Sequence, residues 1–114
     1  MLSKTLLEAL LQFRRERDWE QFHSARNLAA SISVEAAELL EFFIWASDEQ
    51  VQEIVRSRHA EITDEIADIA ILLTYLAHDL SIDIDAAVKN KIQVNAMKYP
   101  AEKARGSNKK YIDL

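Results

Sequence analysis

The stretch that decides the fold runs from Ser24 to Ala46 and reads SARNLAASISVEAAELLEFFIWA. It contains no Gly or Pro, and its apolar residues recur on nearly every face of a helix. We therefore predict one long, mostly buried helix with Ser24 as its N-cap. Glu35 and Glu38 are three residues apart, so they are neighbours on one face. Two carboxylates on a buried helix are costly unless something compensates their charge.

A second acidic stretch, residues 61–73, reads EITDEIADIAILL. Glu65 and Asp68 are again three apart, and an apolar run follows them directly. If the two helices are antiparallel neighbours, both carboxylate pairs meet, and they do not all stay ionised at close range without a cation. Oxygen-only ligation suits Mg²⁺ or Mn²⁺ rather than zinc, and such a site usually binds substrate phosphates as further ligands.

Two other readings compete with this metal site. One is a solvated acidic helix face, which two pairs on apolar helices without compensating bases make less favourable. The other is a di-iron centre, which needs a Glu-x-x-His motif on each of two helices. Only Glu20 and His23 have that spacing, and they lie in a predicted connection.

The composition favours an all-α fold. In 114 residues there are one Gly, one Pro and no Cys. This disfavours turn-rich β folds and excludes Gly-rich phosphate loops, disulfides and thiolate zinc sites. We predict a bundle of four or five helices, in which residues 1–105 form the domain and residues 106–114 a polar, irregular tail.

Local signals place the ends of these helices. A capping box at Thr5–Glu8 opens a helix at about 5–17, and a second box at Ser47–Gln50 restarts the chain. Residues 48–80 form one long helix, or two with a break near Ser57. Asp83 caps a last helix at about 84–99, which Pro100 discourages from continuing.

Charge is distributed unevenly over the chain, whose formal net charge is −5. Residues 35–68 hold ten acidic and two basic residues, whereas residues 69–114 hold five acidic and seven basic ones. This pattern does not predict a nucleic-acid polymer as partner, because a duplex binder shows a basic face. No apolar run reaches the ~18 residues of a membrane span and no signal-peptide core is present, so we expect a cytoplasmic protein without a membrane partner.

The last predicted helix offers a complement to phosphate. Lys91, Asn95 and Lys98 fall on one stripe, with Tyr99 closing it, and lysine and asparagine suit phosphate oxygens and a sugar hydroxyl. A solvated basic face is the alternative.

Aromatic residues offer a stacking slot for a base. The candidates are Trp19, Phe22, His23 and Trp45. Their alternative role is core packing, which we favour for Phe22.

Together these motifs resemble the all-α nucleotide pyrophosphohydrolases of the MazG type. Glu35-Ala-Ala-Glu38, then 26 residues, then Glu65-Ile-Ala-Asp68 has that family's Glu-x-x-Glu…Glu-x-x-Asp pattern. The dCTP pyrophosphatase branch is similar over about residues 10–112, on motifs that comprise Arg17–His23, Arg26-Asn27-Leu28, Trp45, Lys91, Asn95 and Tyr99-Pro100.

The resemblance implies a Mg²⁺-dependent enzyme that cleaves nucleoside triphosphates between the α and β phosphates and prefers deoxycytidine nucleotides. The implied metal ligands are Glu35, Glu38, Glu65 and Asp68, and Glu35 or Glu38 would take the proton from the attacking water. The implied substrate contacts are Lys91 and Asn95, with Lys98 and Tyr99 beside them, for phosphates or sugar, and Trp19, His23 and Trp45 for the base.

Two positions depart from the pattern of a family member, which has His at the position of Leu10 and Tyr at that of Leu72. Both bear on the base and sugar pocket, so dUTP, dATP or a damaged nucleotide stay open as substrates. The apolar surface of 24–46 predicts a homo-oligomer; family members are dimers or tetramers, and we favour the tetramer. The rival from another class is a non-catalytic helical regulatory module that binds a basic partner.

Overall fold

Every regular element of the computed structural model, which describes residues 1–114, is helical. The order is α1 (Lys4–Glu16), η1 (Trp19–Phe22), α2 (Ala25–Glu41), α3 (Asp48–Ser57), α4 (His59–Asp79), α5 (Ile84–Lys98), α6 (Ala101–Ala104) and η2 (Tyr111–Asp113), where η marks a 3₁₀ helix. The predicted all-α class is confirmed. None of the helices is both long enough and apolar enough to span a lipid bilayer.

The chain forms two compact units, residues 1–81 and residues 82–114. The predicted division into a domain 1–105 and a tail 106–114 stays a prediction. Each unit is described by itself below.

Side-chain caps set where most of the helices begin. Ser24, Ser47 and Asp83 each accept a backbone N–H of the helix that follows, as predicted, and the Ser47 capping box has both of its bonds. The predicted cap at Thr5 is wrong, because the side chain of Ser3 caps α1. Ser3, two residues earlier, is extended and its hydroxyl is free to accept, whereas Thr5 already lies inside the helix.

α2 ends at Glu41, short of the predicted end at Ala46. Beyond it the carbonyl oxygen of Leu40 accepts from the N–H groups of both Phe43 and Ile44, at 2.9 and 3.0 Å, which tightens the chain into a turn. The cause lies downstream: Ser47 must be extended, at φ −72° and ψ 163°, to cap α3. The chain therefore leaves the helix before Ser47, through aromatic and β-branched residues that favour a helix only weakly.

α3 and α4 are separate helices, so residues 48–80 follow the second of the two predicted arrangements. The break falls at Arg58, whose φ of −115° and ψ of 26° are not helical, next to the predicted position at Ser57.

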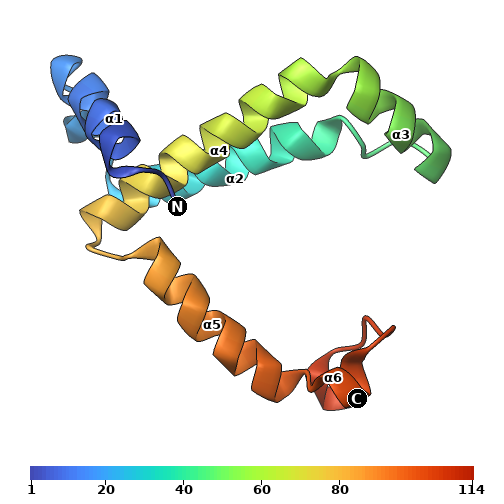
Figure 1. Cartoon of the computed structure of the whole chain (residues 1–114). Coiled ribbons are helices and arrows are strands. Elements are labelled where there is room, and N and C mark those ends of the chain that lie inside the picture. The colour runs from blue at the N-terminus through green and yellow to red at the C-terminus, as the bar shows by residue number, and fades with distance from the viewer. The chain divides into compact units, whose positions relative to one another are not determined.

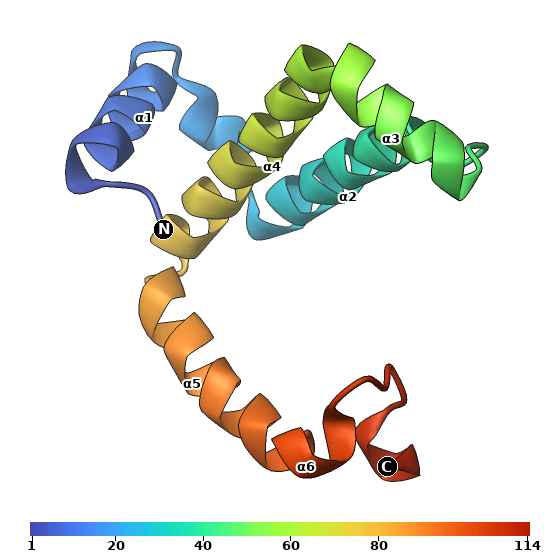
Figure 2. The ribbon, with the colours of Figure 1, turned by 45° about the vertical axis from the view of Figure 1, so that its right-hand side comes forward.

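α2 and α4 lie side by side and antiparallel, and their contact dominates the first unit (Figures 1 and 2). The buried apolar residues are Leu28 on α2 and Tyr75 and Ala77 on α4. The prediction that α2 is buried on most sides is wrong for the single chain, since Val34 and Leu40 are 55% and 52% exposed. One partner helix covers only one face of α2, and the predicted homo-oligomer stays a prediction.

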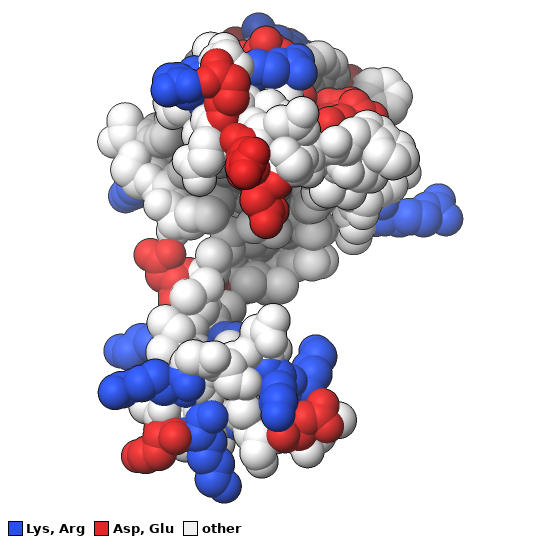
Figure 3. All heavy atoms as spheres, turned by 90° about the vertical axis from the view of Figure 1, so that its right-hand side faces the viewer, with Lys and Arg blue, Asp and Glu red and all other residues white.

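The second unit consists of α5 and the segment that follows it. The tail is irregular, as predicted, apart from η2. Tyr111 in η2 packs on the end of α5: its ring centre lies 6.0 Å from that of Tyr99 and 4.9 Å from Nζ of Lys98. Seven basic and four acidic residues fall in residues 82–114, and many of the basic side chains are visible on the lower part of Figure 3.

Candidate functional site

Three carboxylates from α2 and α4 converge in the first unit. One oxygen each of Glu35, Glu38 and Glu65 lies within 4.8 Å of the other two. Glu35 and Glu38 share a face of α2 because they are three residues apart, and the antiparallel α4 brings Glu65 opposite them. One carboxylate oxygen of Glu65 is buried and has no hydrogen-bond partner within the chain. A buried oxygen without a partner is costly, so this cluster has the donor set and the need for a bound cation.

The repulsion within the cluster changes the acidity of its members. The pKa of Glu35 is raised above its ordinary value, chiefly by the neighbouring carboxyl of Glu65 and next by burial. The pKa of Glu38 is also raised, chiefly by the neighbouring carboxyl of Glu35. A carboxyl that holds its proton more tightly than usual does so here because negative charge is close by, and a cation would remove that cause.

The basic residue beside the cluster does not neutralise it. Arg58 lines a hollow of about 390 Å³ together with Glu38 and Glu65. Its guanidinium forms an ion pair with Glu61 and lies over the ring of Phe42, 4.5 Å from the ring centre. The ion pair raises the pKa of Arg58 and lowers that of Glu61. The three converging carboxylates are therefore left without a paired base.

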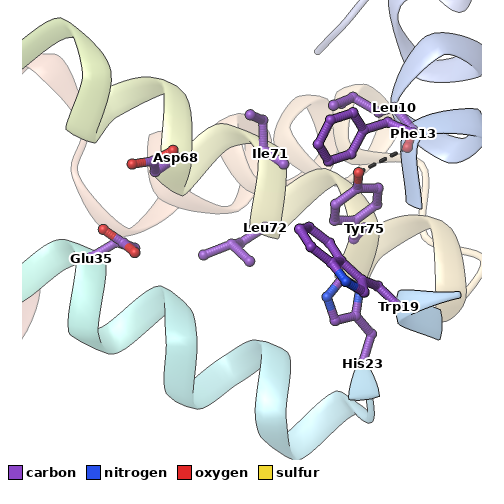
Figure 4. Close-up of a pocket in the computed structure, with 9 residues that line it drawn as sticks. All are labelled: Leu10, Phe13, Trp19, His23, Glu35, Asp68, Ile71, Leu72 and Tyr75. Carbon is purple, nitrogen blue, oxygen red and sulfur yellow. Dashed lines mark hydrogen bonds between the residues drawn. The ribbon is translucent and has the colours of Figure 1, made fainter. Parts of the chain in front are cut away.

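Asp68, the fourth predicted ligand, lies outside the three-carboxylate cluster. It faces a pocket of about 380 Å³ that Glu35 also lines (Figure 4). The residues around this pocket are Leu10, Phe13, Trp19, His23, Glu35, Asp68, Ile71, Leu72 and Tyr75. Glu35 belongs to both features, so the carboxylate cluster and the pocket adjoin each other.

The wall of the pocket opposite the carboxylates is aromatic. Trp19 and His23, two of the residues predicted to line a base pocket, are both part of it. The rings of Trp19 and Phe13 meet edge to face with centres 5.7 Å apart, and those of His23 and Tyr75 are 5.4 Å apart. In Figure 4 these rings gather at the end of the pocket away from Glu35 and Asp68. The arrangement places flat apolar surfaces at one end and negative oxygens at the other.

The two positions that depart from the family pattern, Leu10 and Leu72, also line this pocket. Both contribute apolar surface where the related protein has a polar side chain.

Trp45 is not brought to Trp19 and His23 within the chain. It is 91% exposed and borders a different hollow at the end of α2, next to Phe42 and Ile54. Its predicted role toward a base stays a prediction.

The residues predicted to contact phosphates or sugar lie in the second unit. Lys91, Asn95 and Lys98 are on α5, and Tyr99 follows it directly. Their role toward a substrate also stays a prediction.

Sequence reasoning missed Tyr75 and Arg14. Tyr75 comes seven residues after Asp68, two turns along the same face of α4, so helical periodicity was a usable signal. Arg14 is 5% exposed and donates to both carboxylate oxygens of Asp79, at 2.9 and 2.8 Å. No local pattern indicates that pair, because its members are 65 residues apart in the chain.

Known proteins match this chain over most of its length. Human dCTP pyrophosphatase 1 is 39% identical over 105 residues, and the bovine protein of that name is 41% identical over the same length. These matches cover 90% of this chain, which spans 62% of the length of the relatives. The crystal structure of a pyrophosphatase from Archaeoglobus fulgidus has a TM-score of 0.83 and 43% identity, covering 85% of this chain and 91% of that one. Residues 30–114 match the MazG-like family, and with them both acidic motifs; the chain belongs to that family.

Proposed function

We propose that this chain is a Mg²⁺-dependent nucleoside triphosphate pyrophosphohydrolase that prefers dCTP-like nucleotides and releases a monophosphate and pyrophosphate. The observation that carries the proposal is the convergence of Glu35, Glu38 and Glu65 beside an aromatic pocket, with Glu35 in both. Membership of the MazG-like family and the likeness to dCTP pyrophosphatase 1 support the choice of reaction and base.

The metal would be held by Glu35, Glu38 and Glu65, with Asp68 beside them. These groups fit a hard divalent cation, because they are all carboxylates and one oxygen of Glu65 is buried without a partner. When bound, such a cation neutralises triphosphate charge and lowers the pKa of a water molecule.

The chain's own groups would do the rest. Glu35 or Glu38 accepts the proton of the attacking water. Trp19 stacks against the base at the aromatic end of the pocket, and His23 contacts the base there. Excluding water from that end orients the triphosphate toward the carboxylates.

The proposal also assigns roles to the remaining predicted substrate residues. Lys91, Asn95, Lys98 and Tyr99 would contact the phosphates or the sugar. Trp45 would complete the base pocket of another copy in a homo-oligomer, for which we favour a tetramer; its 91% exposure in the single chain supports a role outside that chain.

The first experiment is a comparison of nucleotides by product analysis. We expect dCTP with Mg²⁺ to give dCMP and pyrophosphate, and a chelator to stop the reaction. A panel that includes dUTP, dATP and 5-substituted dCTP, compared by kcat/KM, identifies the preferred base. Release of orthophosphate instead of pyrophosphate would contradict the proposed bond cleavage, and no hydrolysis of any nucleotide would favour a regulatory module.

A further inference from the structure

A polar network adjoins the aromatic wall of the pocket, and the ion pair within it has no role in the reaction described above. It is built by α1, η1 and α4. The guanidinium of Arg14 binds both carboxylate oxygens of Asp79 and lies over the ring of Tyr75, with Cζ 4.6 Å from the ring centre. One terminal nitrogen of the same guanidinium lies 3.5 Å from Nδ1 of His23, which lines the pocket. Arg14 thus connects a carboxylate outside the pocket to a ring inside it.

The chemistry of the guanidinium decides how His23 carries its proton. A guanidinium has five N–H donors and no acceptor, so a nitrogen that contacts it favourably must be an acceptor. Nδ1 of His23 is therefore unprotonated, and in the neutral ring the proton sits on Nε2. No hydrogen bond joins Nε2 to any group of the chain. The ring is left with one free donor at the pocket.

The surroundings also oppose a charged ring. The pKa of His23 is lowered, chiefly by burial and next by the charge of Arg14. Asp79 and Glu20 act in the opposite direction without reversing the result, and both oxygens of Asp79 are already engaged by Arg14. The Tyr75 hydroxyl donates to the Leu10 carbonyl at 2.8 Å, and the contact between Tyr75 and His23 is between their rings, with centres 5.4 Å apart.

The energetic cost of the ion pair indicates that it does more than stabilise the fold. The pair is weak evidence for stabilisation, because Arg14 is desolvated while Asp79, whose side chain is 32% exposed, has its attraction screened by solvent. Here one further donor, Nε of Arg14, is buried without any partner, which adds to the cost. A costly pair that fixes the state of a pocket residue has a reason to be there that packing alone does not supply.

We propose that the Arg14–Asp79 pair is a positioning device that holds His23 as a neutral ring with its proton on Nε2, so that the pocket presents a hydrogen-bond donor to its ligand. This rests on the proposed function for the identity of that ligand as a nucleotide. The group recognised is then an acceptor on the base, a ring carbonyl or an unprotonated ring nitrogen, such as the O2 and N3 edge of cytosine. Arg14 and Asp79 act through His23 and do not contact the base.

Nitrogen-15 NMR of the wild-type chain tests the tautomer without any variant. Protonated and unprotonated imidazole nitrogens differ widely in chemical shift, and spectra of His59→Gln and His78→Gln assign the third histidine, His23. We expect Nε2 of His23 to be protonated and Nδ1 unprotonated at neutral pH. A proton on Nδ1, or an even mixture of the two tautomers, would overturn the proposal even if the chain hydrolyses dCTP.

Variants then test the positioning role. We expect Arg14→Gln to mix the tautomers, to raise the pKa of His23, and to raise KM for dCTP about twofold with kcat unchanged, since an even mixture halves the population of the competent ring. Arg14→Lys keeps the charge but not the planar fork and should fall between the two. Arg15→Gln removes the same charge from an exposed neighbour and should match the wild type.

A double-mutant cycle separates positioning from general packing. In a His23→Phe background Arg14→Gln should leave KM almost unchanged, because the group through which it acts is gone. Circular dichroism melts check that each variant is folded, and Asp79→Asn replaces Arg14→Gln in the cycle if the latter unfolds. Additive effects on KM would refute the positioning role. A wild-type chain without any hydrolysis would refute the proposed function instead, while the NMR result would still decide the tautomer.

Discussion

Replacing Glu35 by Gln should stabilise the metal-free chain although it removes a residue of the proposed site. Oxygens of Glu35 and Glu65 lie within 4.8 Å of each other, and two unit charges at that separation repel by ~1 kcal/mol in water and ~3.5 kcal/mol at an effective dielectric constant of ~20. Both side chains are only half-buried, so solvent screening favours the lower figure. We expect the free energy of unfolding to rise by about 1 kcal/mol at neutral pH, or the Tm by about 4 °C.

The effect should depend on pH in a defined direction. Because the pKa of Glu35 is raised in the folded chain, chiefly by Glu65, the folded state binds this proton more tightly than the unfolded state does. The stability due to that proton is fully present below the unfolded-state pKa and is lost as the pH rises through the raised pKa. The advantage of Glu35→Gln is therefore largest at neutral pH and should vanish by about pH 4.

Thermal melts followed by circular dichroism in a chelator measure this difference. Glu8→Gln is the matched control, since it removes one negative charge from an exposed position on α1. Adding Mg²⁺ should stabilise the wild type more than Glu35→Gln, because the intact cluster binds the cation more tightly than the cluster without Glu35. A lower Tm for Glu35→Gln than for the wild type in the chelator at neutral pH, or an equal gain from Glu8→Gln, would refute the reasoning.

Three further predictions concern the core, a cap and the chemistry. Leu28→Ala should cost about 3 kcal/mol by urea unfolding, because Leu28 is 1% exposed at the contact of α2 and α4; a loss under about 1 kcal/mol would contradict this packing. Ser47→Ala should cost about 1 kcal/mol by the same measurement, since it removes the capping box of α3. Glu38→Gln and Asp68→Asn should each abolish dCTP hydrolysis with the helical spectrum retained, and wild-type turnover by either would refute the assignment.

Three of the helix starts were predictable because they depend on neighbouring residues alone, whereas the cap of α1 is Ser3 and not the predicted Thr5. A short polar side chain followed by helix-forming residues indicates an N-cap. Each such side chain accepts the expected backbone N–H, at Ser24, Ser47 and Asp83. The end of α2 was less predictable. The apolar pattern continues to Ala46, but Ser47 needs an extended backbone, and these two demands compete. The apolar pattern alone does not indicate the second demand.

The carboxylate cluster was largely predictable, because residues of only two helices build it. The i, i+3 spacings fix which acids share a face, and only the antiparallel pairing of α2 and α4 had to be assumed. Asp68 shows the limit of that reasoning. It shares a face with Glu65 along α4, yet it lines the pocket and lies outside the cluster, and spacing along one helix does not determine how that helix is turned against its neighbour.

The carboxylate cluster and the exposed apolar face of α2 each lack a partner within the single chain. Glu35 and Glu38 hold their protons more tightly than usual, and one oxygen of Glu65 is buried without a partner, so the charges lack a counterion. Val34 and Leu40, on the same helix, are more than half exposed, so the apolar surface lacks a cover. A cation remedies the first deficit and leaves the second unchanged. If Mg²⁺ raised the Tm of the single chain and also converted it to a larger assembly, the two deficits would be coupled through α2, and metal binding would then depend on protein concentration.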